Sequence, residues 1–129
     1  MVKNIHWSLL LVLITLAACS NKQFPQSGAS IQTEQLRSLT ARPNVTLIDV
    51  RTEGEYKEGH IPGAIQLDVL QETQFLQQIQ ALDPKKPYVL YCRSGRRSKQ
   101  AMDLMQQQGF KKVVHLEGGF EGWKGPTEK

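Results

Sequence analysis

The sequence has little of several features that identify common classes of protein. It has two cysteines and three histidines, and His115 has no partner at the spacing of metal ligands, so no metal site is predicted. Lysine and arginine do not form a stripe interleaved with aromatic residues, which argues against nucleic acid as a partner. The strongly apolar run over residues 8–16 is shorter than a membrane-spanning helix requires. The net charge of +4 is mild and does not indicate nucleic acid binding either.

The N-terminal segment has the pattern of an export signal. Lys3 supplies a positive charge, residues 8–16 are almost wholly apolar, and small residues precede Cys19. The ending Leu-Ala-Ala-Cys resembles the end of a bacterial lipoprotein signal, in which cleavage precedes the cysteine and its sulfur and amine become acylated. The sequence therefore predicts a signal peptide over residues 1–18 and a lipidated Cys19. An uncleaved membrane anchor, in which Cys19 has no role, is the alternative.

This pattern predicts a location as well as a modification. The chain would lie in the bacterial cell envelope and contact the membrane through its lipid, and Ser20 favours the periplasmic face of the outer membrane. Residues 19–30 are polar and rich in turn formers, which predicts a flexible tether. With Cys19 acylated, Cys92 is the only free thiol and no intramolecular disulfide can form. A lone thiol in an oxidising compartment suits catalysis better than structure.

Cys92 occupies an unusual position. It follows the apolar run of residues 87–91 and opens the loop Cys-Arg-Ser-Gly-Arg-Arg-Ser, after which a helical pattern begins. Backbone N–H groups converge where a strand meets a helix N-terminus, and the helix dipole favours negative charge there, so the thiolate is favoured over the thiol. The alternative is a small buried hydrophobic residue. Three arginines and a glycine would line an inert core thiol poorly, which favours a reactive Cys92.

The remaining pattern predicts one α/β domain over residues 31–125, followed by a tail over residues 126–129. Helices are expected over residues 33–39, 52–57, 71–82 and 98–108, and short buried strands over residues 45–50, 64–67, 87–91 and 113–116. Apolar strands alternating with helices indicate a central parallel sheet with helices on both faces. Ligands bind such sheets at the carboxyl ends of strands, where Cys92 is predicted to lie.

Three ordered motifs resemble those of the single-domain rhodanese, or sulfurtransferase, family. They are residues 47–51 with Glu55-Tyr56 and residues 59–64, then Tyr91-Cys92 with Gly95 and Arg97-Ser98, and last Gly118-Gly119 with Trp123. The resemblance covers residues 31–125 and implies the rhodanese-like fold.

The resemblance also implies a chemistry. Cys92 would take a sulfane sulfur from a small anionic donor such as thiosulfate and hold it as a persulfide. A thiol or a cyanide-like acceptor would then remove the sulfur, with no cofactor. The donor would be bound by a ring of backbone N–H groups and cations in the loop after Cys92: Arg93, Ser94, Gly95, Arg96 and Arg97. No histidine base is expected, because the thiolate forms in advance.

Several alternatives remain beside this hypothesis. A phosphatase-type loop would need arginine six positions after the cysteine, where this chain has Ser98, so sulfur transfer is favoured over phosphoryl chemistry. Asp49 and Arg51 either shape the site or form a salt bridge that fixes the following turn, and the salt bridge is favoured. His60 is expected to hold backbone geometry. A lipid-tethered, non-catalytic binding module of the rhodanese type is the alternative to an enzyme.

Overall fold

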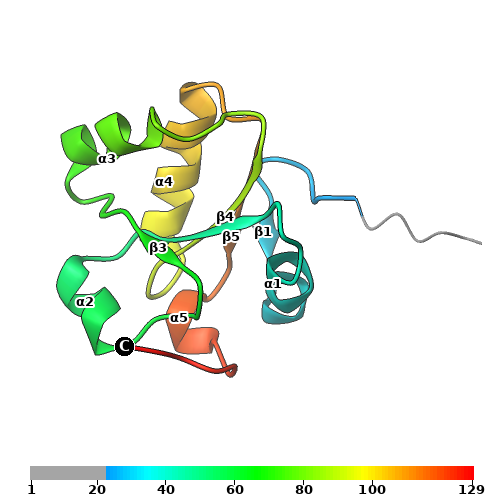
Figure 1. The fold of residues 1–129 in the computed structure, drawn as a ribbon, viewed down its shortest axis with the longest axis vertical. Coiled ribbons are helices and arrows are strands. Elements are labelled where there is room, and N and C mark those ends of the chain that lie inside the picture. The colour runs from blue at the N-terminus through cyan, green and yellow to red at the C-terminus, as the bar shows by residue number, and fades with distance from the viewer. Residues whose placement is uncertain (1–22) are drawn as a thin grey trace, which may run out of the picture.

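The computed structural model describes residues 23–129 (Figure 1). The predicted signal peptide and the predicted lipid site at Cys19 lie outside these residues and stay predictions. Within residues 23–129, no helix combines the length and the apolar character needed to cross a membrane.

A five-stranded, wholly parallel sheet forms the centre of the domain, as predicted. Its strands are β1 (Ser30–Ile31), β2 (Thr46–Asp49), β3 (Ile65–Gln66), β4 (Pro87–Tyr91) and β5 (Lys112–Leu116). They lie in the order β1-β5-β4-β2-β3, which places β4 in the middle. All five residues of β4 are buried, because helices cover both faces of the sheet.

The side chains at and after β4 alternate between two hydrophobic clusters. Tyr88, Leu90 and Cys92 belong to the cluster under α3 (Glu72–Ile79) and α4 (Arg96–Gln107). Val89 and Tyr91 belong to the cluster with α1 (Thr33–Thr40) and α5 (Gly119–Gly122), to which α2 (Glu53–Glu58) also contributes. Figure 1 shows α3 and α4 on one side of the strands and α1 on the other. The period of two therefore points the Cys92 side chain toward α4.

Helix α4 begins earlier than the sequence pattern predicts. Gly95 has φ +102°, a left-handed conformation suited to glycine, and it ends the loop as the residue before the helix. The first helical residue is Arg96, two positions before the predicted start, so Ser98 lies inside the first turn. This shift aims the first-turn N–H groups, including that of Ser98, at the carboxyl end of β4.

The folded domain extends beyond its predicted limits at both ends. Residues 23–30 were predicted as part of a flexible tether, yet the Gly28 N–H donates to the Val113 carbonyl (2.8 Å) and Ser30 pairs with His115 in the sheet. This pairing covers the edge of β5, which would otherwise leave its polar groups without partners. The predicted tail over 126–129 is also packed, because Glu128 and His60 exchange backbone hydrogen bonds of 2.8 and 2.9 Å.

Candidate active site

Cys92 lies at the carboxyl end of β4, below the first turn of α4. Its side chain is 1% exposed. The Gly95 N–H donates to Sγ at 3.1 Å, and Sγ lies 3.6 Å from the hydroxyl oxygen of Ser98. The loop therefore folds back over the sulfur and presents polar hydrogens to it, as a site for an anion requires.

The surroundings of Cys92 lower the pKa of its thiol. Burial acts in the opposite direction, because it disfavours the charged form. Hydrogen bonds from the backbone and hydroxyl of Ser98, and from the backbones of Gly95 and Ser94, outweigh burial. The thiolate is thus stabilised mainly by loop N–H groups and one hydroxyl.

The three loop arginines differ in their partners. Arg97 forms two hydrogen bonds with Glu55, of 2.7 and 2.9 Å, and Arg93 forms one of 2.9 Å with Glu121. The guanidinium of Arg97 holds the pKa of Glu55 at about 2. Arg96 is exposed and has no ion pair within the described residues. Two of the predicted anion-binding cations are therefore already neutralised by carboxylates of other elements.

The segment Gly118-Gly119 packs directly against the Cys92 loop. The Phe120 N–H donates to the Cys92 carbonyl at 2.8 Å, and the Glu121 N–H donates to the Arg93 carbonyl at 3.0 Å. Gly119 has φ +56°, and a Cβ at this position would lie 2.5 Å from both carbonyl oxygens. Only glycine allows the two backbone segments to lie this close together. The glycine motif therefore holds the backbone of the Cys92 loop in place.

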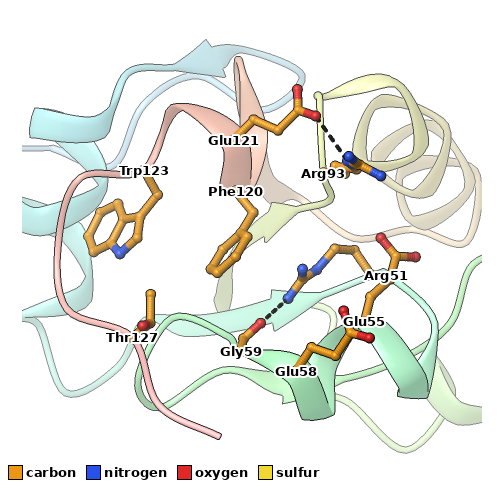
Figure 2. Close-up of a pocket in the computed structure, with 9 residues that line it drawn as sticks. All are labelled: Arg51, Glu55, Glu58, Gly59, Arg93, Phe120, Glu121, Trp123 and Thr127. Atoms are coloured by element: carbon orange, nitrogen blue, oxygen red, sulfur yellow. Dashed lines mark hydrogen bonds and ion pairs between the residues drawn. The ribbon is translucent and has the colours of Figure 1, made fainter.

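Asp49 and Arg51 form a buried ion pair at the carboxyl end of β2. Arg51 Nη2 lies 2.7 Å from Asp49 Oδ2, and the Arg51 N–H donates to Asp49 Oδ1 at 3.0 Å, which fixes the turn. The same guanidinium donates to the Gly59 carbonyl at 2.7 Å and lies 4.3 Å from the ring centre of Phe120. Figure 2 shows Arg51 between Gly59 and Phe120. The pair thus supports both the turn and the wall of a cleft.

That cleft opens beside the Cys92 loop and has a volume of about 600 Å³. Its lining combines aromatic and charged side chains, among them Arg51, Glu55, Arg93, Phe120, Glu121 and Trp123 (Figure 2). Arg93 lines the cleft and follows Cys92 in the chain, whereas the buried Cys92 is not itself among the lining residues. The cleft is of a size to hold a small molecule next to the loop.

The two buried histidines of the described domain have different surroundings. His60 Nδ1 lies 2.9 Å from the Tyr56 carbonyl and its ring stacks on Tyr56, so it holds backbone geometry, in agreement with the expectation. His115 Nδ1 lies 2.9 Å from the Ser98 hydroxyl, which in turn contacts Cys92. The sequence analysis missed this link. The contact joins residues 17 positions apart on α4 and β5, and it becomes visible once β5 is known to pair with β4.

No group of three potential metal ligands occurs in residues 23–129. The site is built instead from one thiol, its hydrogen-bond donors and the cleft beside them. Such an arrangement can hold an anionic sulfur nucleophile and the charge that develops when sulfur is transferred.

Comparison with known proteins gives consistent matches. The profile of the rhodanese-like domain matches residues 32–126. YtwF of Bacillus subtilis (strain 168) is 38% identical over 90 residues, which cover 70% of this chain and 84% of YtwF. The thiosulfate sulfurtransferase GlpE of Coxiella burnetii (strain RSA 331 / Henzerling II) is 34% identical over 86 residues, covering 67% of this chain and 78% of GlpE.

Solved structures agree with the fold. The crystal structure of the Alr3790 protein from Anabaena sp. matches with a TM-score of 0.69 at 28% identity, over 76% of this chain and 81% of that one. Some other relatives are longer proteins, of which this chain spans 31% or 44%. The shared unit is thus the domain itself, which occurs alone and within larger chains.

Proposed function

We propose, from the premise that the chain belongs to the rhodanese-like domain family, that it is a sulfurtransferase in which Cys92 carries the sulfur as a persulfide. Its relative GlpE is named a thiosulfate sulfurtransferase. The observation that carries the proposal is the environment of Sγ, which accepts the Gly95 N–H at 3.1 Å and has its pKa lowered although it is buried. Mass spectrometry of the protein after thiosulfate treatment tests it.

The proposed reaction has two steps. The Cys92 thiolate attacks the sulfane sulfur of thiosulfate, so that a new S–S bond forms, the old one breaks, and its electron pair leaves with sulfite. A thiol or a cyanide-like nucleophile then attacks the outer sulfur of the persulfide, and the electron pair of that bond restores the thiolate. Both states place negative charge beside the N–H groups of Ser94, Gly95 and Ser98, which stabilise it without rearrangement.

Arg97→Ala is expected to raise the thiosulfate KM about tenfold, with a smaller change in kcat. The substitution removes a cation that interacts with the Cys92 charge, and it leaves Glu55 unpaired on the cleft wall, where its carboxylate repels an anionic donor. A charged pair that is partly buried has a larger effect than an exposed one. Steady-state kinetics at varied thiosulfate measure the change.

Arg96→Ala is the matched control for this prediction. Arg96 is exposed and has no ion pair within the described residues. Because an exposed charge contributes little, its loss should change the thiosulfate KM by less than about threefold. Equal effects of the two substitutions would mean that Arg97 has no special place in donor binding.

We also propose that a lipid on Cys19 anchors the domain to the bacterial cell envelope, on the periplasmic face of the outer membrane. The support is the Leu-Ala-Ala-Cys sequence after an apolar run and one lysine. Cys19→Ser in a bacterial host should leave the precursor uncleaved and without acyl chains, and two or more chains are needed for firm anchoring. Intact mass and membrane fractionation measure this, and a native protein that keeps Met1 contradicts the proposal.

A further inference from the structure

A continuous chain of polar side chains leads from the Cys92 thiol to the surface. Sγ contacts the Ser98 hydroxyl at 3.6 Å, that hydroxyl lies 2.9 Å from His115 Nδ1, and His115 Nε2 lies 2.9 Å from the Ser30 hydroxyl. These residues come from the end of β4, the first turn of α4, β5 and β1. Ser98 is 0% and His115 5% exposed, whereas Ser30 is exposed.

The burial of Cys92 makes such a chain useful. A thiol must lose its proton before it can act as a nucleophile, and Cys92, which is 1% exposed, has little direct contact with water that could take up the proton. None of Ser98, His115 and Ser30 lines the cleft of Figure 2. A proton that follows this chain therefore leaves the site without crossing the space that a sulfur donor would occupy.

The geometry points to a proton path in which His115, acting through Ser98, accepts the proton of the Cys92 thiol and Ser30 connects the histidine with solvent. This inference rests on the proposed function, because a proton path matters only if Cys92 is a nucleophile. His115 does not touch the sulfur, so it is a positioning residue.

The proton transfer balances atom by atom. The thiol donates its proton to Ser98 Oγ while the hydroxyl proton of Ser98 passes to His115 Nδ1. The products are a Cys92 thiolate and a His115 imidazolium, and no bond between heavy atoms changes. The imidazolium then donates from Nδ1 to Ser98 and from Nε2 to Ser30. The proton that Ser98 receives lies between its oxygen and Sγ, so the hydroxyl then donates to the thiolate. The same hydroxyl can instead donate to the Gly95 carbonyl, which lies 3.1 Å away.

The surroundings of His115 favour its neutral form, which can accept a proton. Burial, followed by the nearby Lys99 on α4, lowers the pKa of His115, so it is neutral at neutral pH. Asp103 on α4 and Glu117 after β5 act in the opposite direction and stabilise the imidazolium once it forms. From β4 the group that faces this network is Cys92 itself, whose negative charge also stabilises the imidazolium.

The pH dependence of Cys92 alkylation by iodoacetamide, a neutral reagent, tests the path. In the wild type, transfer of the proton from Cys92 to His115 takes up no proton from solvent, so its equilibrium does not depend on pH. A constant population of thiolate therefore remains below the thiol pKa, and the alkylation rate levels off there. His115→Asn keeps a donor to Ser98 but cannot accept a proton. Its rate should fall about tenfold per pH unit and be about tenfold below that of the wild type near pH 6. At high pH, where the thiol is ionised in both proteins, the rates should converge.

His60→Asn is the matched control, because it makes the same change at a histidine that is equally buried and lies outside the path. It should keep the wild-type shape of the profile. Ser98→Ala removes the hydroxyl that joins the thiolate to the imidazolium and stabilises both charges, so the plateau should fall to a lower rate. The test therefore does not depend on the folding of one variant. Urea unfolding confirms that each variant is folded.

Parallel profiles for the wild type, His115→Asn and Ser98→Ala would overturn the proton path, since a merely structural histidine would change the rate at every pH alike. Alkylation requires no sulfur transfer. A wild type that shows the plateau but forms no persulfide would therefore contradict the proposed function and leave the path standing. A wild type that forms the persulfide without a plateau would contradict the path alone.

Discussion

Cys92→Ser is expected to abolish sulfur transfer from thiosulfate while the domain stays folded. A serine hydroxyl in this place keeps its proton at neutral pH, so no comparable nucleophile forms. The smaller oxygen fits the space of the sulfur and can still accept the Gly95 N–H, so the loop keeps its hydrogen bond. We expect the free energy of unfolding to change by about 1 kcal/mol or less.

Two measurements check this expectation. Turnover with thiosulfate and cyanide should fall to the uncatalysed rate, and urea unfolding should keep its cooperative transition. A variant that retains sulfur transfer would exclude Cys92 as the sulfur carrier. A variant that loses both transfer and folding would show that the thiol contributes to the core more than its contacts indicate.

Gly119→Ala is expected to have the largest effect on stability, a loss of about 2–4 kcal/mol. The new Cβ would lie 2.5 Å from the carbonyl oxygens of Cys92 and Arg93, which are backbone atoms and cannot turn away. The left-handed φ of +56° disfavours any residue with a side chain and accounts for about 1–2 kcal/mol of the expected loss. Relief of this contact would shift the Cys92 loop, so sulfur transfer should fall at least about tenfold as well.

Gly118→Ala separates the two causes. Gly118 also has a left-handed φ, +75°, but nothing lies within 4 Å of the position of its Cβ. It should therefore lose about 1–2 kcal/mol through backbone strain, with little change in the thiol site. Equal losses for both substitutions, measured by urea unfolding, would mean that the contact with the Cys92 loop contributes nothing.

The position of Cys92 could be predicted because it depends on local sequence. An apolar run that ends at a cysteine, a glycine three residues later and a helical pattern after that place the thiol between a strand and a helix N-terminus. The α/β architecture follows from the same alternation. The exact start of α4 depends on the conformation of Gly95, which composition does not determine.

The charge of the site could not be predicted in the same way. Arginines near Cys92 indicate a cationic loop, but Glu55 lies 42 positions from Arg97 and Glu121 lies 28 positions from Arg93. The fold brings these carboxylates to the loop, and their effect depends on contacts that sequence spacing does not reveal. The contact between His115 and Ser98 was missed for a related reason, since it depends on the strand order that pairs β5 with β4.

The limits of the domain were predicted from composition, and the packing of residues outside those limits shows that composition was a poor guide to them. Residues 27–30 are all small, as in a linker, yet the Ser27 hydroxyl accepts the Val113 N–H at 3.2 Å and Ser30 joins the sheet. A polar segment can complete an edge strand as well as a linker, because sheet pairing uses backbone groups that every residue has.

The central claim, that Cys92 carries sulfur, is tested most directly by the intact mass of the purified protein after brief treatment with thiosulfate. The account predicts a gain of one sulfur atom, located on the peptide that contains Cys92, removed by cyanide or a thiol and absent from Cys92→Ser. A wild-type protein that is folded and gains no sulfur would contradict the account. Cys92 would then be a structural thiol, and a non-catalytic binding module would be the better explanation of the site.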